Sequence, residues 1–565
     1  MDLLRNIKTA LGELRAELVL RNARVINVLT GEIVRADVAV TDGTIVGVGR
    51  YEAGRETVDL NGRYLAPGFI NAHCHVESSM VTPWQYCREE LRHGVTTLIT
   101  DPHEIANVAG MEGVRYMLDA SEDVPVNYYV QLPSCVPATG FEHAGAVLTA
   151  EKLLELKRHP RVLGLGEMMN YPGVIGCDSN VLAKLDAFSD RIIDGHAPGV
   201  TGNGLQAYAA AGIQTDHESV TWEEAREKLR AGMAVLIREG SASRNLTELV
   251  RGLLRDGVDT SNMAFCTDDK HLADIRREGT IRHNMCMAVA LGMAPVTAIQ
   301  LGTRNAARIY GVKGLGAVAP GCRADMVVLE DLRDFTVHEV YKDGVCVVRA
   351  GEVLTKETPV PAGDRICHSV HLAPLGQRDL SLPDRGIQPV IALQPGQITT
   401  GHESVETGAV EREMAAGALR KIAVLERHHA TGHVGVGLIS GYGLTHGAVA
   451  TTVAHDSHNL IVVGDNDDDM RAAIRKIETM EGGYCLTMDG EVVGALPLPV
   501  AGLMSDRPAD EFIPLLEKLL ERARAMGVAP GIDPFTTLSF VALPVIPALR
   551  LTDAGMFDVD RFSFV

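Results

Sequence analysis

The apolar and polar positions of the chain fall into three successive patterns. Residues 17–50 alternate β-branched with polar residues, and Thr-Gly and Asp-Gly pairs interrupt them, which predicts antiparallel strands joined by tight turns. A similar block begins at Gly321, and its Lys-Asp-Gly turn at 342–344 matches the Thr-Asp-Gly turn at 41–43. Two such blocks around an insertion predict one small, discontinuous, β-sandwich-like domain. It would comprise residues 1–66, which include an N-terminal helix, and residues 313–360.

Between these blocks, short apolar runs alternate with helical stretches, which is typical of repeated βα units around a parallel sheet. Eight runs predict a (β/α)8 TIM barrel over residues 67–312. Several runs end in residues that bind metals or move protons, and such barrels place their chemistry at the carboxyl ends of their strands. The runs are YLAPGFINAH, GVTTLITDPHE, VNYYVQLP, RVLGLGE, RIIDGHA, GIQTDHE, MAVLIREG and MAFCTDD.

A third pattern follows a proline-rich stretch after Val360 and covers residues 382–565. Residues 410–429 and 468–480 read as helices, whereas VGVGLIS and LIVVGD read as apolar strands. This alternation predicts a separate C-terminal α/β domain.

Length and composition agree with several folded domains. The chain has 565 residues, of which 46% are hydrophobic and 22% charged, and these values exclude a disordered protein. A formal net charge of −20 argues against nucleic-acid and membrane-lipid partners and favours a small-molecule ligand. The ten cysteines show no CxxC pair or framework spacing, and no signal peptide or membrane span is recognisable, so we expect reduced thiols in the cytoplasm.

Histidines and carboxylates at the ends of the barrel runs predict a metal centre. His73 and His75 end the first run, and side chains two positions apart on a strand share a face, so both imidazoles should point into the barrel mouth while Cys74 points away. Imidazoles together with carboxylates suit transition metals, and there are enough of them for two ions that share a bridging carboxylate. The further candidate ligands are Glu167, His196, His217 and Asp268.

The pattern of these candidate ligands on the barrel strands resembles that of the amidohydrolase superfamily. Longer motifs resemble those of the bacterial adenine deaminase family, and this resemblance covers nearly the whole chain. The motifs are PGFINAHCHVESSM, TTLITDPHEIANVAG, FCTDD and VAHDSHNLIVVGDND. The resemblance implies metal-dependent hydrolytic deamination of adenine to hypoxanthine and ammonia in purine salvage. It further implies two divalent ions, with Mn²⁺ expected and Fe²⁺ or Zn²⁺ as alternatives. We also expect a homo-oligomer of two or more chains. Many amidohydrolases carry a carboxylated lysine on strand 4; here Glu167 would bridge the metals directly.

Roles for individual residues follow from chemistry and from the resemblance. Asp268, near metal and water, is the expected proton carrier, and Glu77 is expected to help protonate the purine ring. Asp269 and Glu218 face away on an ideal strand, so they are not expected to be ligands. Expected substrate contacts are Glu77, His103, Glu104, Arg238 and Ser241.

Several alternatives stay open at this point. Glu77 could instead orient a ligand imidazole, and His103 and Glu104 could belong to a helix cap that Asp101 forms. The cluster of His455, Asp456 and His458 favours a domain interface over a metal site.

Two other functions compete with deamination. A cyclic-amide hydrolase, such as a dihydroorotase or hydantoinase, would use the same ligand frame, although the missing strand 4 lysine speaks against it. A catalytically silent assembly protein on this barrel is disfavoured because no ligand is lost.

Overall fold

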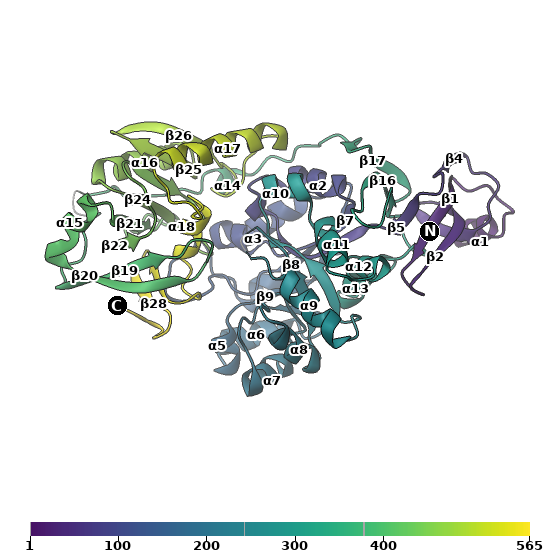
Figure 1. Cartoon of the computed structure of the whole chain (residues 1–565), viewed down its shortest axis with the longest axis horizontal. Helices are drawn as coiled ribbons and strands as arrows, with labels where there is room; N and C mark the ends of the chain where they lie inside the picture. Colours follow the sequence, from purple (N-terminus) through teal and green to yellow (C-terminus); the bar gives the residue numbers. More distant parts are fainter. Residues whose placement is uncertain (1, 242, 377–378) are drawn as a thin grey trace.

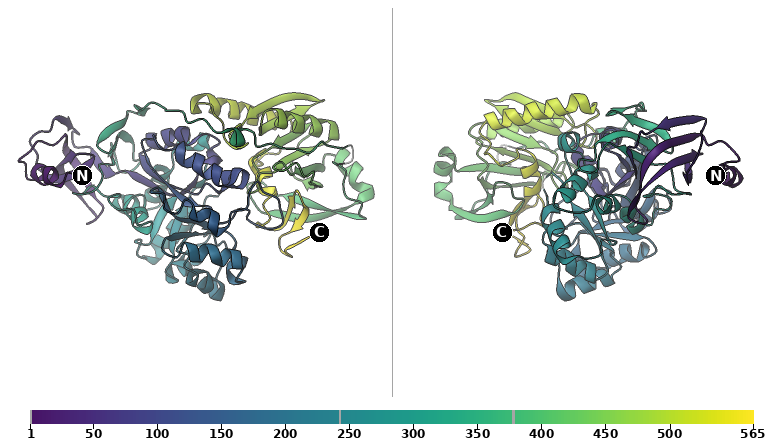
Figure 2. Two further views of the ribbon diagram at one scale, coloured as in Figure 1. Left: turned by 180° about the vertical axis from the view of Figure 1, so that it is seen from behind. Right: turned by 45° about the vertical axis from the view of Figure 1, so that its right-hand side comes forward.

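The computed structural model describes residues 2–241, 243–376 and 379–565. Three parts follow one another along the long axis of the molecule (Figure 1). A sheet of N-terminal strands lies at one end, the barrel lies in the middle, and the C-terminal sheet lies at the other end, as the rotated views of Figure 2 also show. Within the described residues, no helix is both long and apolar enough to cross a membrane.

Strands from both sides of the barrel insertion share one nine-stranded sheet, in the order β18-β17-β16-β15-β5-β1-β2-β3 with β4 on β1. Within the sheet, the antiparallel pair β5–β15 joins the two halves. Turns at Asp42-Gly43 and Asp343-Gly344 have positive φ at all four residues, which is the backbone of a type I′ hairpin. The elements are α1 (Leu3–Ala10), β1 (Leu18–Asn27), β2 (Glu32–Thr41), β3 (Thr44–Gly49), β4 (Glu56–Asp59), β5 (Tyr64–Pro67), β15 (Met326–Leu329), β16 (Val337–Lys342), β17 (Val345–Arg349) and β18 (Glu352–Val353).

All eight predicted runs contain parallel barrel strands. They form sheets of six and three strands, and the β14–β6 pair brings the last unit back to the first. Between β10 and β11, Gln214 N donates to Ile193 O at 2.9 Å. The first run is divided, because Tyr64–Pro67 joins the outer sheet and only the following residues enter the barrel. The strands are β6 (Phe69–His75), β7 (Val95–Thr100), β8 (Asn127–Leu132), β9 (Val162–Met168), β10 (Ile192–Gly195), β11 (Thr215–Asp216), β12 (Ala234–Arg238), β13 (Met263–Cys266) and β14 (Asp268–Asp269).

Helices surround these strands and bury their outward side chains, as a barrel requires (Figure 1). They are η1 (Glu77–Ser79), α2 (Pro83–Arg92), α3 (His103–Asp119), α4 (Ala150–Leu154), α5 (Tyr171–Ile175), α6 (Ser179–Ala187), α7 (Gly202–Ala210), α8 (Trp222–Arg230), α9 (Leu246–Asp256), α10 (Leu272–Glu278), α11 (Ile281–Ala290), α12 (Pro295–Leu301) and α13 (Arg304–Ile309).

The C-terminal region forms a mixed eight-stranded sheet in the order β20-β19-β22-β21-β24-β23-β25-β26, and a hairpin, β27–β28, with a short third strand packs beside it. Many of its buried side chains share one hydrophobic cluster with those of the barrel, while others form smaller clusters of their own. The elements are α14 (Asp364–Cys367), β19 (Ile387–Leu393), β20 (Thr400–Glu406), η2 (Thr407–Ala409), α15 (Val410–Ala415), β21 (Leu419–Leu425), β22 (Val434–Ser440), β23 (Ala448–Thr451), β24 (Leu460–Gly464), α16 (Asp467–Thr479), β25 (Gly483–Met488), β26 (Glu491–Pro497), α17 (Ala509–Ala525), α18 (Thr536–Val541), β27 (Leu549–Thr552), β28 (Gly555–Asp558) and β29 (Ser563–Phe564).

One predicted helix of this region is wrong. Only α15 (Val410–Ala415) of residues 410–429 is helical, and the chain continues through Gly417, at φ +82°, into β21 (Leu419–Leu425). Strand β21 lies between β22 and β24, and its apolar residues are buried, so pairing on both edges overrides the local preference for helix. The second predicted helix is present as α16.

Candidate metal centre and substrate pocket

The six residues predicted as ligands lie together at the carboxyl ends of the barrel strands. His73 and His75 come from β6, Glu167 from β9 and Asp268 from β14, while His196 and His217 directly follow β10 and β11. Triplets of their side-chain donor atoms lie within 4.8 Å of one another. The side chain of His196 is 21% exposed and that of Asp268 11%, whereas the other four are almost fully buried.

Glu167 stands between two pairs of histidines. Its Oε1 lies 3.3 Å from His75 Nε2 and 3.9 Å from His73 Nε2. Its Oε2 lies 2.8 Å from His196 Nδ1 and 3.2 Å from His217 Nε2. One carboxylate therefore offers a separate oxygen to each pair, which is the arrangement that a bridging ligand requires.

The backbone of Glu167 is held by residues that follow β7 and β8. Glu167 N donates to Asp101 Oδ2 at 2.9 Å, and Ser134 Oγ donates to Glu167 O at 2.5 Å. A Cβ at position 166 would lie 2.1 Å from the same Asp101 oxygen, so only glycine fits there. The Asp101 side chain therefore accepts a hydrogen bond from Glu167 N and does not cap a helix. Helix α3 begins after Pro102 without a side-chain cap, so Asp101 does not form the helix cap that the sequence had left open.

Asp268 divides its two oxygens between ligands and an arginine. Oδ1 lies 3.0 Å from His75 Nε2 and 3.6 Å from His73 Nε2, while Oδ2 accepts a hydrogen bond from Arg238 at 2.8 Å. The backbone of Asp268 is left-handed, at φ +59°, and such strain of about 1–3 kcal/mol persists where the surroundings impose it. The side chain of Asp269 points elsewhere and accepts a hydrogen bond from Ser78.

Burial alone would raise the pKa of both carboxyl groups. The surrounding imidazoles, His196 first, hold the pKa of Glu167 well below its usual range. Interactions with His73 and His75 and the charge of Arg238 have the same effect on the pKa of Asp268. Both groups are therefore anionic near neutral pH.

The histidines of this cluster fit a divalent metal. Both ring nitrogens of His73 and of His217 are buried without a hydrogen-bond partner among the described residues, and the two rings stack with centroids 4.1 Å apart. Such unpaired buried groups are costly, about 1–3 kcal/mol each, and they are rare in folded proteins. Metal coordination would pair them, and imidazole with carboxylate is a donor set for divalent transition metals.

The structure adds Glu218, which strand parity had excluded. Its Oε1 lies 3.4 Å from His217 Nε2 and 3.7 Å from His196 Nδ1, and its carboxylate is ion-paired with Arg238. Strand alternation does not govern His217 and Glu218, because β11 ends at Asp216 and the residues that follow are not part of a strand. Arg238 itself is buried between Glu218 and Asp268 and does not line the pocket described below.

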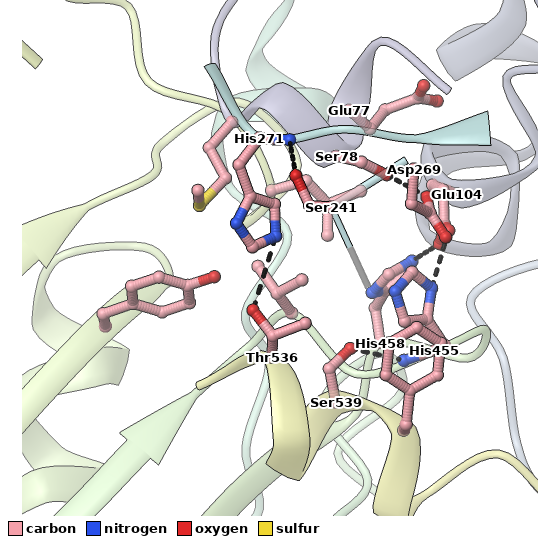
Figure 3. Close-up of a pocket in the computed structure, with 15 residues that line it drawn as sticks. Glu77, Ser78, Glu104, Ser241, Asp269, His271, His455, His458, Thr536 and Ser539 are labelled. Carbon is pink, nitrogen blue, oxygen red and sulfur yellow. Dashed lines mark hydrogen bonds and ion pairs between the residues drawn. The ribbon is translucent and has the colours of Figure 1, made fainter. Parts of the chain in front are cut away.

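A pocket lies near the metal cluster, because its lining includes Glu77 and Asp269, which follow His75 and Asp268 closely in the sequence. None of the six candidate ligands is among its lining residues, and its walls come from two regions of the chain (Figure 3). The barrel contributes three of the predicted substrate contacts, Glu77, Glu104 and Ser241. Ser241 is fixed there, because its hydroxyl donates to Asp274 and accepts from His271 N. Tyr484 and residues of α18 form much of the opposite wall. The C-terminal lining includes His455, His458, Tyr484, Thr536, Ser539 and Phe540.

Glu77 does not orient a ligand imidazole. The strand ends at His75, and Glu77 begins the short helix η1 with its side chain buried. The Nδ1–H of His75 donates instead to the carbonyl of Asp101 at 2.8 Å. Glu77 Oε1 accepts from Ile105 N at 3.2 Å, while Oε2 has no partner among the described residues, and burial raises the pKa of Glu77 to about 7.

Glu104 connects the barrel to the C-terminal region. Its Oε1 lies 2.7 Å from His455 Nδ1, and His458 Nε2 contacts its Oε2 (Figure 3). His458 Nδ1 accepts a hydrogen bond from Ala454 N at 3.0 Å, so the neutral ring carries its proton on Nε2 and donates it to Glu104. This use of His458 matches the domain interface expected from the sequence.

His103 lies between this contact and the metal cluster. Its Nε2 is 3.4 Å from Glu104 Oε1, its Nδ1 is 3.4 Å from Glu167 Oε1, and its ring packs on that of His75. It therefore belongs to the surroundings of the ligands rather than to the pocket wall. The pocket side chains of the C-terminal region, Tyr484, Thr536, Ser539 and Phe540, were not predicted, and no local motif marks them.

Comparisons with known proteins agree with this architecture. The model of the amidohydrolase family matches residues 64–347, and that of the adenine deaminase C-terminal domain matches residues 397–563. "Adenine deaminase 2" of Carboxydothermus hydrogenoformans is 48% identical over 564 residues, 99% of this chain and 98% of that protein. "Adenine deaminase" of Desulfitobacterium hafniense is 47% identical over 567 residues, 100% of this chain and 99% of that protein. The chain therefore belongs to the adenine deaminase family of the amidohydrolases.

Proposed function

We propose that the chain catalyses hydrolytic deamination of adenine to hypoxanthine and ammonia. The names of its full-length relatives indicate this reaction, and membership of the amidohydrolases implies a divalent metal. The observation that carries the proposal is the position of Glu167, with one oxygen toward each histidine pair and a pocket nearby.

We assign the ligands of each ion according to which carboxylate oxygen of Glu167 they face. His73 and His75, with Asp268, would hold one ion, and His196 and His217 the other. We propose manganese as the native metal, with iron or zinc as substitutes that the same donors accept. When bound, such ions lower the pKa of water so that it is nucleophilic at neutral pH.

Asp268 is the proposed proton carrier. Its anionic Oδ1 faces the ligands, and Arg238 holds Oδ2. In this position it accepts a proton from the water that attacks C6 of the purine and delivers it to the departing amino group. Arg238, itself neutralised by Glu218 on its other side, keeps the carboxylate oriented.

Glu77 is the proposed second acid. Burial raises the pKa of Glu77 to about 7, which favours the protonated form, and its unpartnered Oε2 is available to carry a proton to a ring nitrogen. The aromatic faces of Tyr484 and Phe540 suit a planar, uncharged purine. Among the described residues that line the pocket there is no arginine, so the pocket lacks the bidentate guanidinium that suits an anionic ring such as dihydroorotate.

The primary test is an assay of purified, manganese-loaded protein. We expect ammonia release from adenine and no hydrolysis of dihydroorotate or hydantoin. Faster opening of a cyclic imide than deamination of adenine would replace the proposal with the cyclic-amide hydrolase, and an inert protein would favour an assembly role.

Glu77→Gln should lower kcat for adenine roughly 10-fold, comparable with the loss of other groups that support a metal site. The amide preserves shape but cannot donate the acid proton. Ser78→Ala, at the next residue of the same pocket, is the matched control and should change turnover much less. Unchanged turnover in Glu77→Gln would remove the residue from the mechanism.

Elemental analysis should find two divalent ions per chain in active protein. The six candidate ligands, Glu167 among them, are more than a single four-coordinate ion uses. Dialysis against a chelator should remove both ions and the activity together. Full activity with well under one equivalent of metal would contradict the two-ion assignment.

The cellular compartment and the oligomeric state are the last two parts of the proposal. All ten cysteines are free, which supports the reducing cytoplasm and a place in purine salvage. The homo-oligomer expected from the resemblance stays a prediction, which light scattering of the purified protein would check.

A further inference from the structure

A second group of metal-binding side chains lies away from the barrel mouth, where three segments of the chain meet. His143 belongs to the loop between β8 and α4, His433 directly precedes β22, and Asp553 occupies the turn between β27 and β28. Their donor atoms all lie within 4.8 Å of one another. None of the three belongs to the metal centre or to the pocket described above.

We propose that His143, His433 and Asp553 form a separate zinc-type metal site that fastens the barrel loop to the C-terminal region. The distances carry this inference. Asp553 Oδ2 lies 2.5 Å from His143 Nδ1 and 3.9 Å from His433 Nδ1, and the two Nδ1 atoms are 3.4 Å apart. Metal bonds of about 2.0–2.2 Å at tetrahedral angles separate ligand atoms by roughly 3.3–3.5 Å. Small side-chain adjustments would therefore bring all three atoms onto one ion.

The protonation chemistry of this cluster also favours a cation. Each neutral imidazole has one N–H and one lone pair, and a carboxylate only accepts. The Nδ1–H of His143 can donate to Asp553. If His433 Nδ1 also carries a proton, it competes for the same carboxylate oxygen; if it does not, its lone pair faces His143 without a hydrogen to accept. A divalent ion takes a lone pair from each atom at once, and both histidines can then carry their proton on Nε2.

Asp553 is oriented for this role by hydrogen bonds to its other oxygen. His143 N donates to Oδ1 at 3.1 Å, and Asn459 Nδ2 donates to it at 3.2 Å. Asn459 Nδ2 also donates to the carbonyl of His143 at 2.8 Å. The aspartate side chain is fully buried, so Oδ2 is held toward the histidines, and such outer partners commonly fix metal ligands in place.

Packing sets the distance between the two segments that carry His143 and Asp553. The ring of Phe141 lies 4.5 Å from that of Phe557 and 5.0 Å from that of Phe562. Thr552 Oγ1 donates to the carbonyl of Phe141 at 2.8 Å. The loop is thus docked on the C-terminal hairpin before any metal binds, and little ordering remains to be done on binding.

The type of ion follows from the donors. Two imidazoles and one carboxylate suit zinc, nickel or cobalt, whereas calcium and magnesium prefer oxygen ligands. The two histidine side chains are 45% and 52% exposed, which leaves the fourth position to water and gives the ion access from solvent.

The test uses the full-length protein with its catalytic metal complement in place. Zinc is added in slight excess, unbound metal is removed by gel filtration, and the zinc and total metal content are measured. We expect one more equivalent of metal in the wild type than in His433→Ala, and an affinity at least roughly 10-fold lower in that variant. His433 is half exposed, so its replacement leaves the fold intact, and deamination of adenine should stay at the wild-type level.

His368→Ala is the matched control, because His368 is an exposed histidine with a single carboxylate neighbour, Glu481. It should retain the additional equivalent. Zinc should also raise the thermal unfolding midpoint of the wild type and of His368→Ala but not that of His433→Ala, since an ion that binds only the folded state stabilises it. Equal metal content in the wild type and His433→Ala, or an equal rise in midpoint, would overturn the proposal.

Discussion

Asp268→Asn should lower kcat for adenine by roughly 10²–10⁴-fold, the range that positioned acid–base groups contribute. Asparagine has the same shape and tolerates the left-handed backbone that Asp268 adopts at φ +59°, so the fold should be preserved. It cannot accept the proton of the attacking water as a carboxylate does. Steady-state kinetics on metal-loaded protein would measure the change.

Asp269→Asn is the matched control, because it removes the same charge one residue further along. Asp269 lines the pocket and accepts a hydrogen bond from Ser78. Its backbone pairs with His75 across β14 and β6, but its side chain forms no ion pair with the histidines of the metal cluster among the described residues. Its replacement should affect KM more than kcat. A larger fall in kcat for Asp269→Asn than for Asp268→Asn would show that Asp269, and not Asp268, is the proton carrier.

Glu167→Gln should lose metal and at least about 10²-fold in activity. The amide retains the volume of the side chain but removes the negative charge that would offset the two proposed cations. Metal ions supply several kcal/mol of transition-state stabilisation, and each 1.36 kcal/mol corresponds to a factor of ten in rate. Elemental analysis and the ammonia assay on the same preparation would show both losses together.

Glu239→Gln provides the comparison for Glu167→Gln. Glu239 is also a buried carboxylate at the end of a barrel strand, but its Oε2 accepts a hydrogen bond from Leu246 N instead of facing a histidine. Its replacement should leave both ions bound. If Glu167→Gln keeps two ions and near-normal turnover, Glu167 has a structural role and the bridge is wrong.

The sequence by itself determined the barrel and predicted six of the side chains that gather at its mouth. Apolar periodicity is a local property, and each of the eight runs could be recognised without knowing its neighbours. Once the runs are parallel barrel strands, their carboxyl ends must meet, so His73, His75, Glu167 and Asp268 had to converge. The two-residue turns of the outer sheet were predictable for the same reason, because their Asp-Gly chemistry is local.

Tertiary structure alone decided how individual side chains are used. Glu218 reaches His217 because β11 is short and ends before both residues, which no alternation of polar and apolar residues reveals. Residues 419–425 are a strand because two other strands pair with them, although their local sequence favours helix.

The most distant contacts were decided in the same way. Glu104 and His458 are separated by 354 positions, and the His143–Asp553 pair by 410. The sequence around each of these residues gives no indication of which distant residue it contacts. Contacts between regions depend on how the barrel and the C-terminal sheet pack in a shared hydrophobic cluster, so the walls of the pocket and the second metal site were visible only in the folded chain.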